Sequence, residues 1–138
     1  MTVVLTTETI KLMNLFETIT HIPVKDCLIE NNMVYFLVEE GTIRKAIGAN
    51  GISVKTFKSL VKKDVKVYEY SKDLLKFIKN LIPQARDVRI KTEGDNVIAE
   101  VKIDKSAKPI VMGRNGRNIK VIKEFLKRNH KIKDLIVR

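Results

Sequence analysis

The same short residue pattern occurs twice in this 138-residue chain, with an offset of 65 residues. The first copy is Gly48-Ala49-Asn50-Gly51, and the second is Gly113-Arg114-Asn115-Gly116. Since glycine has no side chain, the backbone of a polyanion can approach the main chain closely at such a turn. The turn amides, and the N-termini of helices starting at Ile52 and Arg117, would present N–H donors and a positive dipole end. The pattern therefore predicts phosphate recognition at two equivalent turns.

The charge of the chain is concentrated around and after these turns. The net charge is +11, from 27 Lys and Arg residues against 16 Asp and Glu residues. Residues 1–70 carry 9 basic and 8 acidic residues, whereas residues 71–138 carry 18 and 8. Within the first half, residues 1–40 carry 2 basic and 6 acidic residues, and residues 41–70 carry 7 and 2. This distribution indicates a polyanionic partner, nucleic acid in particular, although any single lysine can equally be solvated helix surface.

We predict that nucleic-acid contacts come from the turns, their basic flanks and the apolar residues beside them. In the first half these are Arg44, Lys45, Ile47, Gly48, Ala49, Asn50, Gly51, Lys55 and Lys58. In the second half they are Lys108, Met112, Gly113, Arg114, Asn115, Gly116, Arg117 and Lys120. Arg114 can donate two parallel hydrogen bonds to a phosphate, and the first turn has no charged residue. We therefore expect the second turn to bind more tightly.

The aliphatic residues beside the turns allow two interpretations. Ile47 and Val54 in the first copy, and Met112 and Ile119 in the second, either form the floor of a groove under the bases or belong to the core. The chain has no Trp, and neither turn contains an aromatic residue. This composition argues against a platform on which bases stack.

Hydrophobic periodicity places each turn between two helices. The first half reads as a helix over 6–19, strands over 24–30 and 33–39, helices over 43–47 and 52–62, and a strand over 65–68. The second half reads as a helix over 72–82, strands over 88–90 and 97–103, a short helix from Pro109, a helix that turns Ile119, Ile122, Phe125 and Leu126 inward, and a strand over 132–137. Ile10 and Leu60 are assigned to the apolar faces of the first and third helices. We expect an α/β (α+β) fold of two modules, 1–70 and 71–138, that pack into one rigid body without a flexible linker.

The element order and the two glycine turns resemble the KH domain of the prokaryotic type (type II), in which a three-stranded sheet packs on helices. The tandem arrangement resembles the NusA family of transcription factors, in the short archaeal form made of two KH modules. This resemblance implies a single-stranded RNA-binding factor of transcription elongation, termination or antitermination, which holds about four nucleotides of nascent RNA in each of two adjoining clefts. It implies RNA polymerase as a second partner. The alternatives are a KH protein of ribosome assembly or RNA turnover, and a protein-interaction module whose uncharged first turn has lost RNA affinity.

No catalytic constellation is visible in the sequence. His21 and His130 are far apart, and neither stands at metal-ligand spacing from Cys27 or a carboxylate. We therefore expect no enzymatic activity, no cofactor and no metal. The single cysteine is predicted to lie in the core of a monomeric protein in a reducing, cytoplasmic setting, and no apolar run approaches the roughly 20 residues that cross a membrane.

The acidic residues of the first half allow two interpretations. They either form a solvated face far from the turns or a docking surface for RNA polymerase. The set comprises Glu8, Glu17, Asp26, Glu30, Glu39 and Glu40.

Overall fold

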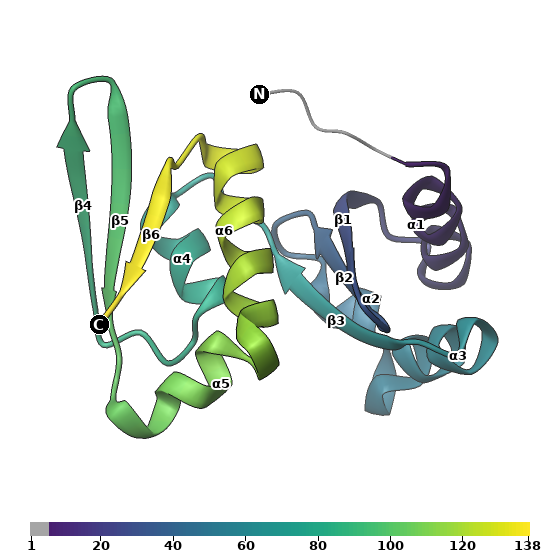
Figure 1. Cartoon of the computed structure of the whole chain (residues 1–138). Coiled ribbons are helices and arrows are strands. Elements are labelled where there is room, and N and C mark those ends of the chain that lie inside the picture. The colour runs from purple at the N-terminus through teal and green to yellow at the C-terminus, as the bar shows by residue number, and fades with distance from the viewer. Residues whose placement is uncertain (1–5) are drawn as a thin grey trace. The chain divides into compact units, whose positions relative to one another are not determined.

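A computed structural model describes residues 6–138 of the chain (Figure 1). The chain divides into two compact units, one ending at Lys72 and the other spanning Asp73–Arg138. Residues 1–5 of the predicted first module lie outside the described residues. Both units have the predicted element order, helix–strand–strand–helix–helix–strand.

In the first unit the glycine turn lies inside a crossover between two parallel strands. The elements are α1 (Thr7–Thr20), β1 (Val24–Glu30), β2 (Met33–Val38), α2 (Ile43–Ile47), a 3-10 turn (Ala49–Gly51), α3 (Ile52–Val61) and β3 (Asp64–Glu69). The sheet order is β1-β2-β3, with β1 antiparallel and β3 parallel to β2. Because parallel neighbours need a crossover connection, the chain between β2 and β3 must leave the sheet and return, and α2, the turn and α3 occupy that path.

Local sequence sets both ends of α1. Thr6 caps the helix: its side-chain oxygen accepts from the backbone N–H of Thr9 at 3.1 Å, and the Thr9 side chain accepts from the backbone N–H of Thr6 at 2.9 Å. This reciprocal arrangement satisfies two donors that a helix start otherwise leaves free. His21 ends the helix in a left-handed conformation, φ 59°, and its N–H donates to the Glu17 carbonyl.

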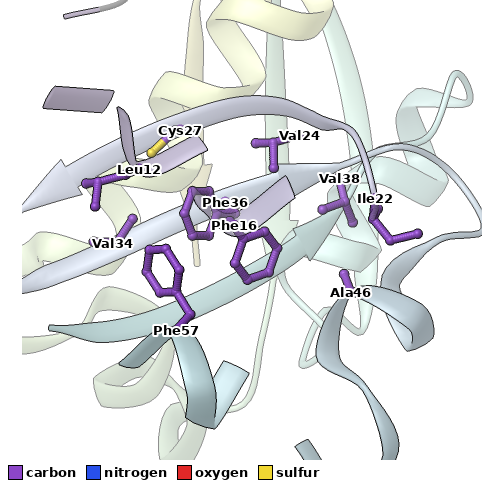
Figure 2. Close-up of a cluster of buried hydrophobic side chains, with 10 residues drawn as sticks. All are labelled: Leu12, Phe16, Ile22, Val24, Cys27, Val34, Phe36, Val38, Ala46 and Phe57. Carbon is purple, nitrogen blue, oxygen red and sulfur yellow. The ribbon is translucent and has the colours of Figure 1, made fainter. Parts of the chain in front are cut away.

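Three phenylalanines form the centre of the first core (Figure 2). Phe16 of α1 stacks on Phe36 of β2 with ring centroids 4.3 Å apart. Phe57 of α3 meets these two rings edge-on at 5.4 and 5.2 Å. Such aromatic pairs add to the stabilisation that burial alone provides. Cys27 lies in the same cluster and is buried, as predicted.

The second unit repeats the topology with a longer last helix. Its elements are α4 (Leu74–Leu81), β4 (Asp87–Glu93), β5 (Asn96–Lys102), a 3-10 turn (Lys105–Ala107), α5 (Lys108–Met112), a second 3-10 turn (Arg114–Gly116), α6 (Arg117–His130) and β6 (Asp134–Val137). The sheet order is β4-β5-β6, antiparallel and then parallel. The predicted fold class, two tandem KH modules with three-stranded sheets packed on helices, is confirmed.

The structure corrects several details of the sequence interpretation. Ile10 and Leu60, assigned to apolar faces, are exposed, because each lies at the edge of its helix's apolar stripe. Phe77 of α4, which the sequence analysis did not select, is fully buried. β6 begins at Asp134 rather than at residue 132, because the N–H of Ile132 still donates to the Leu126 carbonyl at the end of α6.

The acidic residues of the first unit are not simply a solvated face. Asp26 is only 1% exposed, and its carboxylate accepts from the Cys27 N–H at 2.8 Å, so the solvated assignment is wrong for this residue. The Glu17 carboxylate accepts from the Val24 N–H at 2.8 Å, at the start of β1. These carboxylates therefore help to fix the chain at the start of β1 and within that strand.

The described residues contain neither a candidate membrane span nor a candidate metal site. Within residues 6–138, no helix combines the length and apolarity needed to cross a membrane. Over the same range, no cluster of His, Cys, Asp and Glu side chains could hold a metal ion.

Candidate nucleic-acid interface

The first glycine of each turn adopts a backbone conformation that is essentially restricted to glycine. Gly48 has φ 82° and ψ 166°, and Gly113 has φ 75° and ψ 171°. A Cβ on Gly48 would lie 2.7 Å from the Ser53 Oγ and 3.0 Å from its nitrogen. A Cβ on Gly113 would lie 2.7 Å from the Asn118 Cβ and 2.9 Å from its nitrogen. The missing side chain thus lets the following helix come close to the turn.

An asparagine at the third position completes each turn. Asn50 and Asn115 have φ values of 54° and 56°, in the left-handed region. Asparagine tolerates that region better than most residues with a side chain. This requirement explains why asparagine occurs in both copies, which the sequence analysis did not recognise.

The structure changes which amides are available as donors. The N–H groups of Ile52 and Arg117, predicted to face a phosphate, donate instead to the carbonyls of Ala49 and Arg114. The amides of the second and third turn residues make no hydrogen bond within residues 6–138. These residues, Ala49, Asn50, Arg114 and Asn115, are all exposed. Each turn therefore presents two adjacent donors, three and two positions before the helix start, and these are turn amides that the sequence analysis named together with the helix N-termini.

The basic flanks of the first turn divide into two groups. Arg44 and Lys45 are exposed in the last turn of α2. The Lys55 side chain leans over the turn, because its Cε lies 3.9 Å from where a Cβ on Gly51 would stand. Lys58 instead pairs with Asp64 at 2.8 Å, which ties α3 to the start of β3. Lys58, one of the predicted cations, is thus already engaged by a carboxylate.

In the second unit, cations stand in the turn itself. Arg114 is exposed, and its side chain makes no hydrogen bond or ion pair with any of residues 6–138. Arg117 and Lys120 follow in the first turn of α6. Lys108 starts α5, so the length of that helix separates it from the turn. The structure therefore brings Arg114, Arg117 and Lys120 together and leaves Lys108 apart.

The aliphatic residues beside the turns fall into two classes, which resolves part of the open question. Ile47 and Met112, which precede the turns, are 36% and 39% exposed and can line a surface groove. Ile119 is only 8% exposed and belongs to the core, while Val54 is half-buried. Ile52, directly after the first turn, is 58% exposed. It occupies the same position of the repeat as Arg117, but the sequence analysis did not select it as a contact residue.

The helices around the two turns are fixed by different side chains. In the second unit the Asn118 amide donates to the Val111 carbonyl at 2.8 Å and joins α6 to α5. The side chain of its counterpart Ser53 makes no hydrogen bond within the described part of the chain. In the first unit the Glu69 carboxylate accepts from the N–H groups of Gly41 at 3.0 Å and Ile43 at 3.3 Å, and so holds the start of α2. The Glu69 contacts join residues 26 and 28 positions apart in the sequence, which no local pattern reveals, whereas the Asn118 contact spans seven residues.

The chain is similar to archaeal proteins that share the name "Probable transcription termination protein NusA". The protein from Methanocaldococcus jannaschii is 39% identical over 130 residues, covering 93% of this chain and 71% of the relative. The protein from Methanococcus vannielii is 34% identical, covering 86% and 70%. The protein from Thermoplasma acidophilum is 27% identical, covering 95% and 92%.

Among solved structures, the crystal structure of a protein named APE1850 superposes with a TM-score of 0.79 at 27% identity, covering 97% of this chain and all of that one. No protein-family model matches the chain.

Proposed function

The chain belongs to the short archaeal NusA family, and on this premise we propose that it is a transcription termination factor that binds single-stranded RNA through its two glycine turns. The finer proposal is a factor of elongation, termination or antitermination that reads the nascent transcript. Each turn would clamp about four nucleotides, as KH modules do.

One observation carries the RNA-binding proposal: the same exposed turn, with the same backbone angles, is built twice beside exposed cations. A pair of adjacent amides without an internal partner suits the oxygens of one phosphate. Exposed Ile47 and Met112 beside the turns would contact the bases of the same nucleotides. The glycines and asparagines set this geometry, and the flanking Arg and Lys residues supply charge.

The two turns are proposed to bind with unequal strength. Arg114 places a guanidinium inside the second turn, where it can form charge-assisted hydrogen bonds with a phosphate. The first turn depends on Arg44, Lys45 and Lys55 around its rim. The exposed Ile52 favours one alternative for the first turn alone, an apolar contact with a protein in place of a phosphate contact.

Further parts of the proposal come from the family. RNA polymerase is the proposed protein partner, because the relatives are named as transcription termination proteins. We propose a monomer without enzymatic activity, located in the cytoplasm, with KH modules over residues 1–70 and 71–138.

The test is fluorescence anisotropy with a short single-stranded RNA at two salt concentrations. Wild type is compared with Ala49→Asp/Asn50→Asp and with Arg114→Asp/Asn115→Asp. The second variant should lose most of the affinity and the first a smaller part. The control, Asn96→Asp/Lys133→Asp, makes the same charge change as the second variant at the far end of the β5–β6 sheet.

The salt dependence separates phosphate binding from other modes. Each phosphate that the wild type neutralises should contribute a slope of about −0.7 in log affinity against log salt. A variant that loses the Arg114 contacts should lose part of this slope. Equal weakening in the control would show that net charge, and not the turns, determines binding, and full affinity in both turn variants would contradict the proposal.

A further inference from the structure

Three lysines recur at matching positions after the two glycine turns. Residues 41–64, placed over residues 106–129, are identical at six positions, and three of these are the Gly, Asn and Gly of the turn. The other three are lysines of the helix that follows. We call each set the lysine ridge of its unit: Lys55, Lys58 and Lys62 in and directly after α3, and Lys120, Lys123 and Lys127 in α6.

The lysines of a ridge lie along one exposed side of the helix. Residues three and seven positions apart share a helix face, and Lys123 and Lys127 follow Lys120 at these spacings. The core-facing residues of α6, Ile122 and Leu126 among them, are buried. All six ridge lysines are exposed. Each ridge is therefore a row of cations directed away from the core of its unit.

Each ridge starts at the turn and leads away from it. In the first unit the Lys55 Cε lies 3.9 Å from where a Cβ on Gly51 would stand. In the second unit Lys127 follows Gly116 by 11 residues, about 16 Å along the axis of α6 (Figure 1). Because a stacked strand advances about 3.4 Å per nucleotide, this length corresponds to about five nucleotides.

The middle lysine of each ridge has a structural role. Lys58 pairs with Asp64 at 2.8 Å, and Lys123 pairs with Asp134 at 3.4 Å. Each aspartate is the first residue of the strand that closes the sheet of its unit. These ion pairs account for the recurrence of one lysine of the three.

The fold does not account for the outer lysines in the same way. The side chains of Lys55, Lys62 and Lys127 make no hydrogen bond or ion pair with any of residues 6–138. Their charge is therefore available to a ligand, at the start of the ridge in the first unit and at the far end in both units.

Nearby carboxylates do not cancel this charge. Residues 52–64 contain four Lys and Arg residues and one acidic residue, and residues 117–134 contain seven and two. Both acidic residues of the second range are already paired, Glu124 with Arg128 at 3.1 Å and Asp134 with Lys123. The elements α4, α5 and β6, which pack against α6, have a single acidic residue between them, Asp134. The ridge of the second unit thus keeps a net positive charge.

The composition of α6 favours a nucleic-acid strand over a protein partner. Protein interfaces are usually centred on apolar or aromatic side chains, and no apolar residue of α6 is exposed. A row of cations that is continuous with a phosphate site suits a sugar–phosphate backbone that runs on from that site.

We propose that the lysine ridge of each unit is a second contact for the RNA backbone, which holds the strand where it continues beyond the nucleotides clamped at the glycine turn. Lys62 and Lys127 contact phosphates at the far end of this path. The inference rests on the proposed function and extends it, because each unit would hold about five nucleotides more than the about four at its turn.

The test is fluorescence anisotropy with single-stranded RNAs of about four and about ten nucleotides. Every chain carries Ala49→Asp/Asn50→Asp, so that the second turn dominates binding. This parent chain should bind the longer RNA more tightly than the shorter one. Lys127→Gln should weaken binding of the longer RNA about threefold or more and lower its salt slope by about 0.7, because one phosphate contact is lost. Binding of the shorter RNA should stay within about twofold.

Lys76→Gln is the matched control. Lys76 is exposed on α4 of the same unit, so this variant removes the same charge outside the ridge. It is also a repeated lysine, since Lys11 stands 65 residues earlier. The control should bind both RNAs within about twofold of the parent chain.

Three results would overturn the inference. These are no gain in affinity from the longer RNA, an equal loss for both RNAs in Lys127→Gln, and an equal loss in Lys76→Gln.

The turn variant Arg114→Asp/Asn115→Asp, made in the same parent chain, separates this inference from the proposed function. If the turn variant binds the shorter RNA as the parent does, the proposed function fails and the inference fails with it. If the turn variant loses the shorter RNA while Lys127→Gln keeps full affinity for the longer one, the inference alone fails.

Discussion

The two glycine turns share their backbone and differ in almost every side chain around it. Gly48 and Gly113 agree within 7° in φ and 5° in ψ, and Asn50 and Asn115 agree within 2° in both angles. By contrast, the second position is Ala49 in one turn and Arg114 in the other. The repeated feature is therefore the backbone geometry of the turn, and a charged residue inside the turn is present in one copy only.

The surroundings of the turns differ in the same direction. The second turn is braced across its two helices by the Asn118–Val111 hydrogen bond, whereas Ser53 leaves the equivalent position unbraced. The first unit instead fixes the far end of α2 through Glu69. A rigid, charged turn loses less entropy on binding than a less constrained neutral one. The comparison thus separates two contributions, geometry and charge, that variants can test in turn.

The largest effect is expected from removing the shared geometry. Gly113→Ala forces a Cβ to within 3 Å of the Asn118 backbone and should lower the free energy of unfolding by about 2–4 kcal/mol. Gly94→Ala, at a similarly positive φ but with no atom within 4 Å of the new Cβ, should cost about 1 kcal/mol. Urea denaturation measures both. Equal losses would mean that backbone conformation alone, without the close approach of α6, requires glycine.

The next effect concerns charge. Arg114→Ala should weaken RNA binding about tenfold, equivalent to about 1.4 kcal/mol, because it removes a charge-assisted contact from an intact turn. Ala49→Arg should strengthen binding at the first turn by a few-fold, since the backbone there is already the same. Anisotropy of each variant with the same RNA provides the measurement. No gain in Ala49→Arg would show that charge does not limit the RNA affinity of the first turn, and that Ile52 or the absence of a hydrogen bond like that of Asn118 does.

A smaller effect is expected from exchanging Asn118, which donates a hydrogen bond to the Val111 carbonyl, and its counterpart Ser53. Asn118→Ser removes the hydrogen bond to the Val111 carbonyl and should lower the free energy of unfolding by about 1 kcal/mol. Ser53→Asn offers the same amide to the Ala46 carbonyl and should raise it by a few tenths of a kcal/mol. Thermal unfolding measures the stability of both variants. Unchanged stability in Asn118→Ser would show that the Asn118–Val111 hydrogen bond does not stabilise the second unit.

The smallest effect tests a feature that both units share. Lys58 pairs with Asp64 at 2.8 Å, and Lys123, 65 residues later, pairs with Asp134 at 3.4 Å. Because all four side chains are about half exposed, Lys58→Met and Lys123→Met should each change stability by about 0.5 kcal/mol or less. Equal and salt-sensitive changes are expected. A large change in one variant alone would mark that pair as part of the folding core of its unit.

Local sequence was sufficient to predict the elements and the turns. Thr6, His21 and the glycine turns act on their own neighbourhood, so the pattern of residues alone identifies them. The location of the positive charge was likewise predicted by counting basic and acidic residues in each part of the sequence. The helix ends shifted by one or two positions, where capping is decided by a few hydrogen bonds.

Features that depend on distant contacts were not predicted. Phe77 becomes core, and Ile10 and Leu60 do not, because burial depends on which element packs against each helix. The burial of Asp26 and the bond from Asn118 to Val111 likewise require the assembled fold. Of the amide donors that the sequence analysis named, the N–H groups of Ile52 and Arg117 are not available, since the 3-10 geometry uses them internally.

The parallel pairing of the last strand in each unit has a consequence for how the protein is made. In the second unit, β6 pairs with β5 from Ile98↔Asp134 to Val101↔Val137, and the whole turn region lies between these strands. During synthesis from the N-terminus, Gly113–Gly116 leaves the ribosome well before the strand that closes its crossover. Long-range parallel pairing is slow because loop-closure entropy must be overcome before contacts form. The nascent turn therefore gains its surrounding structure only after its own unit is complete, and the proposed RNA binding would begin only with that folding step.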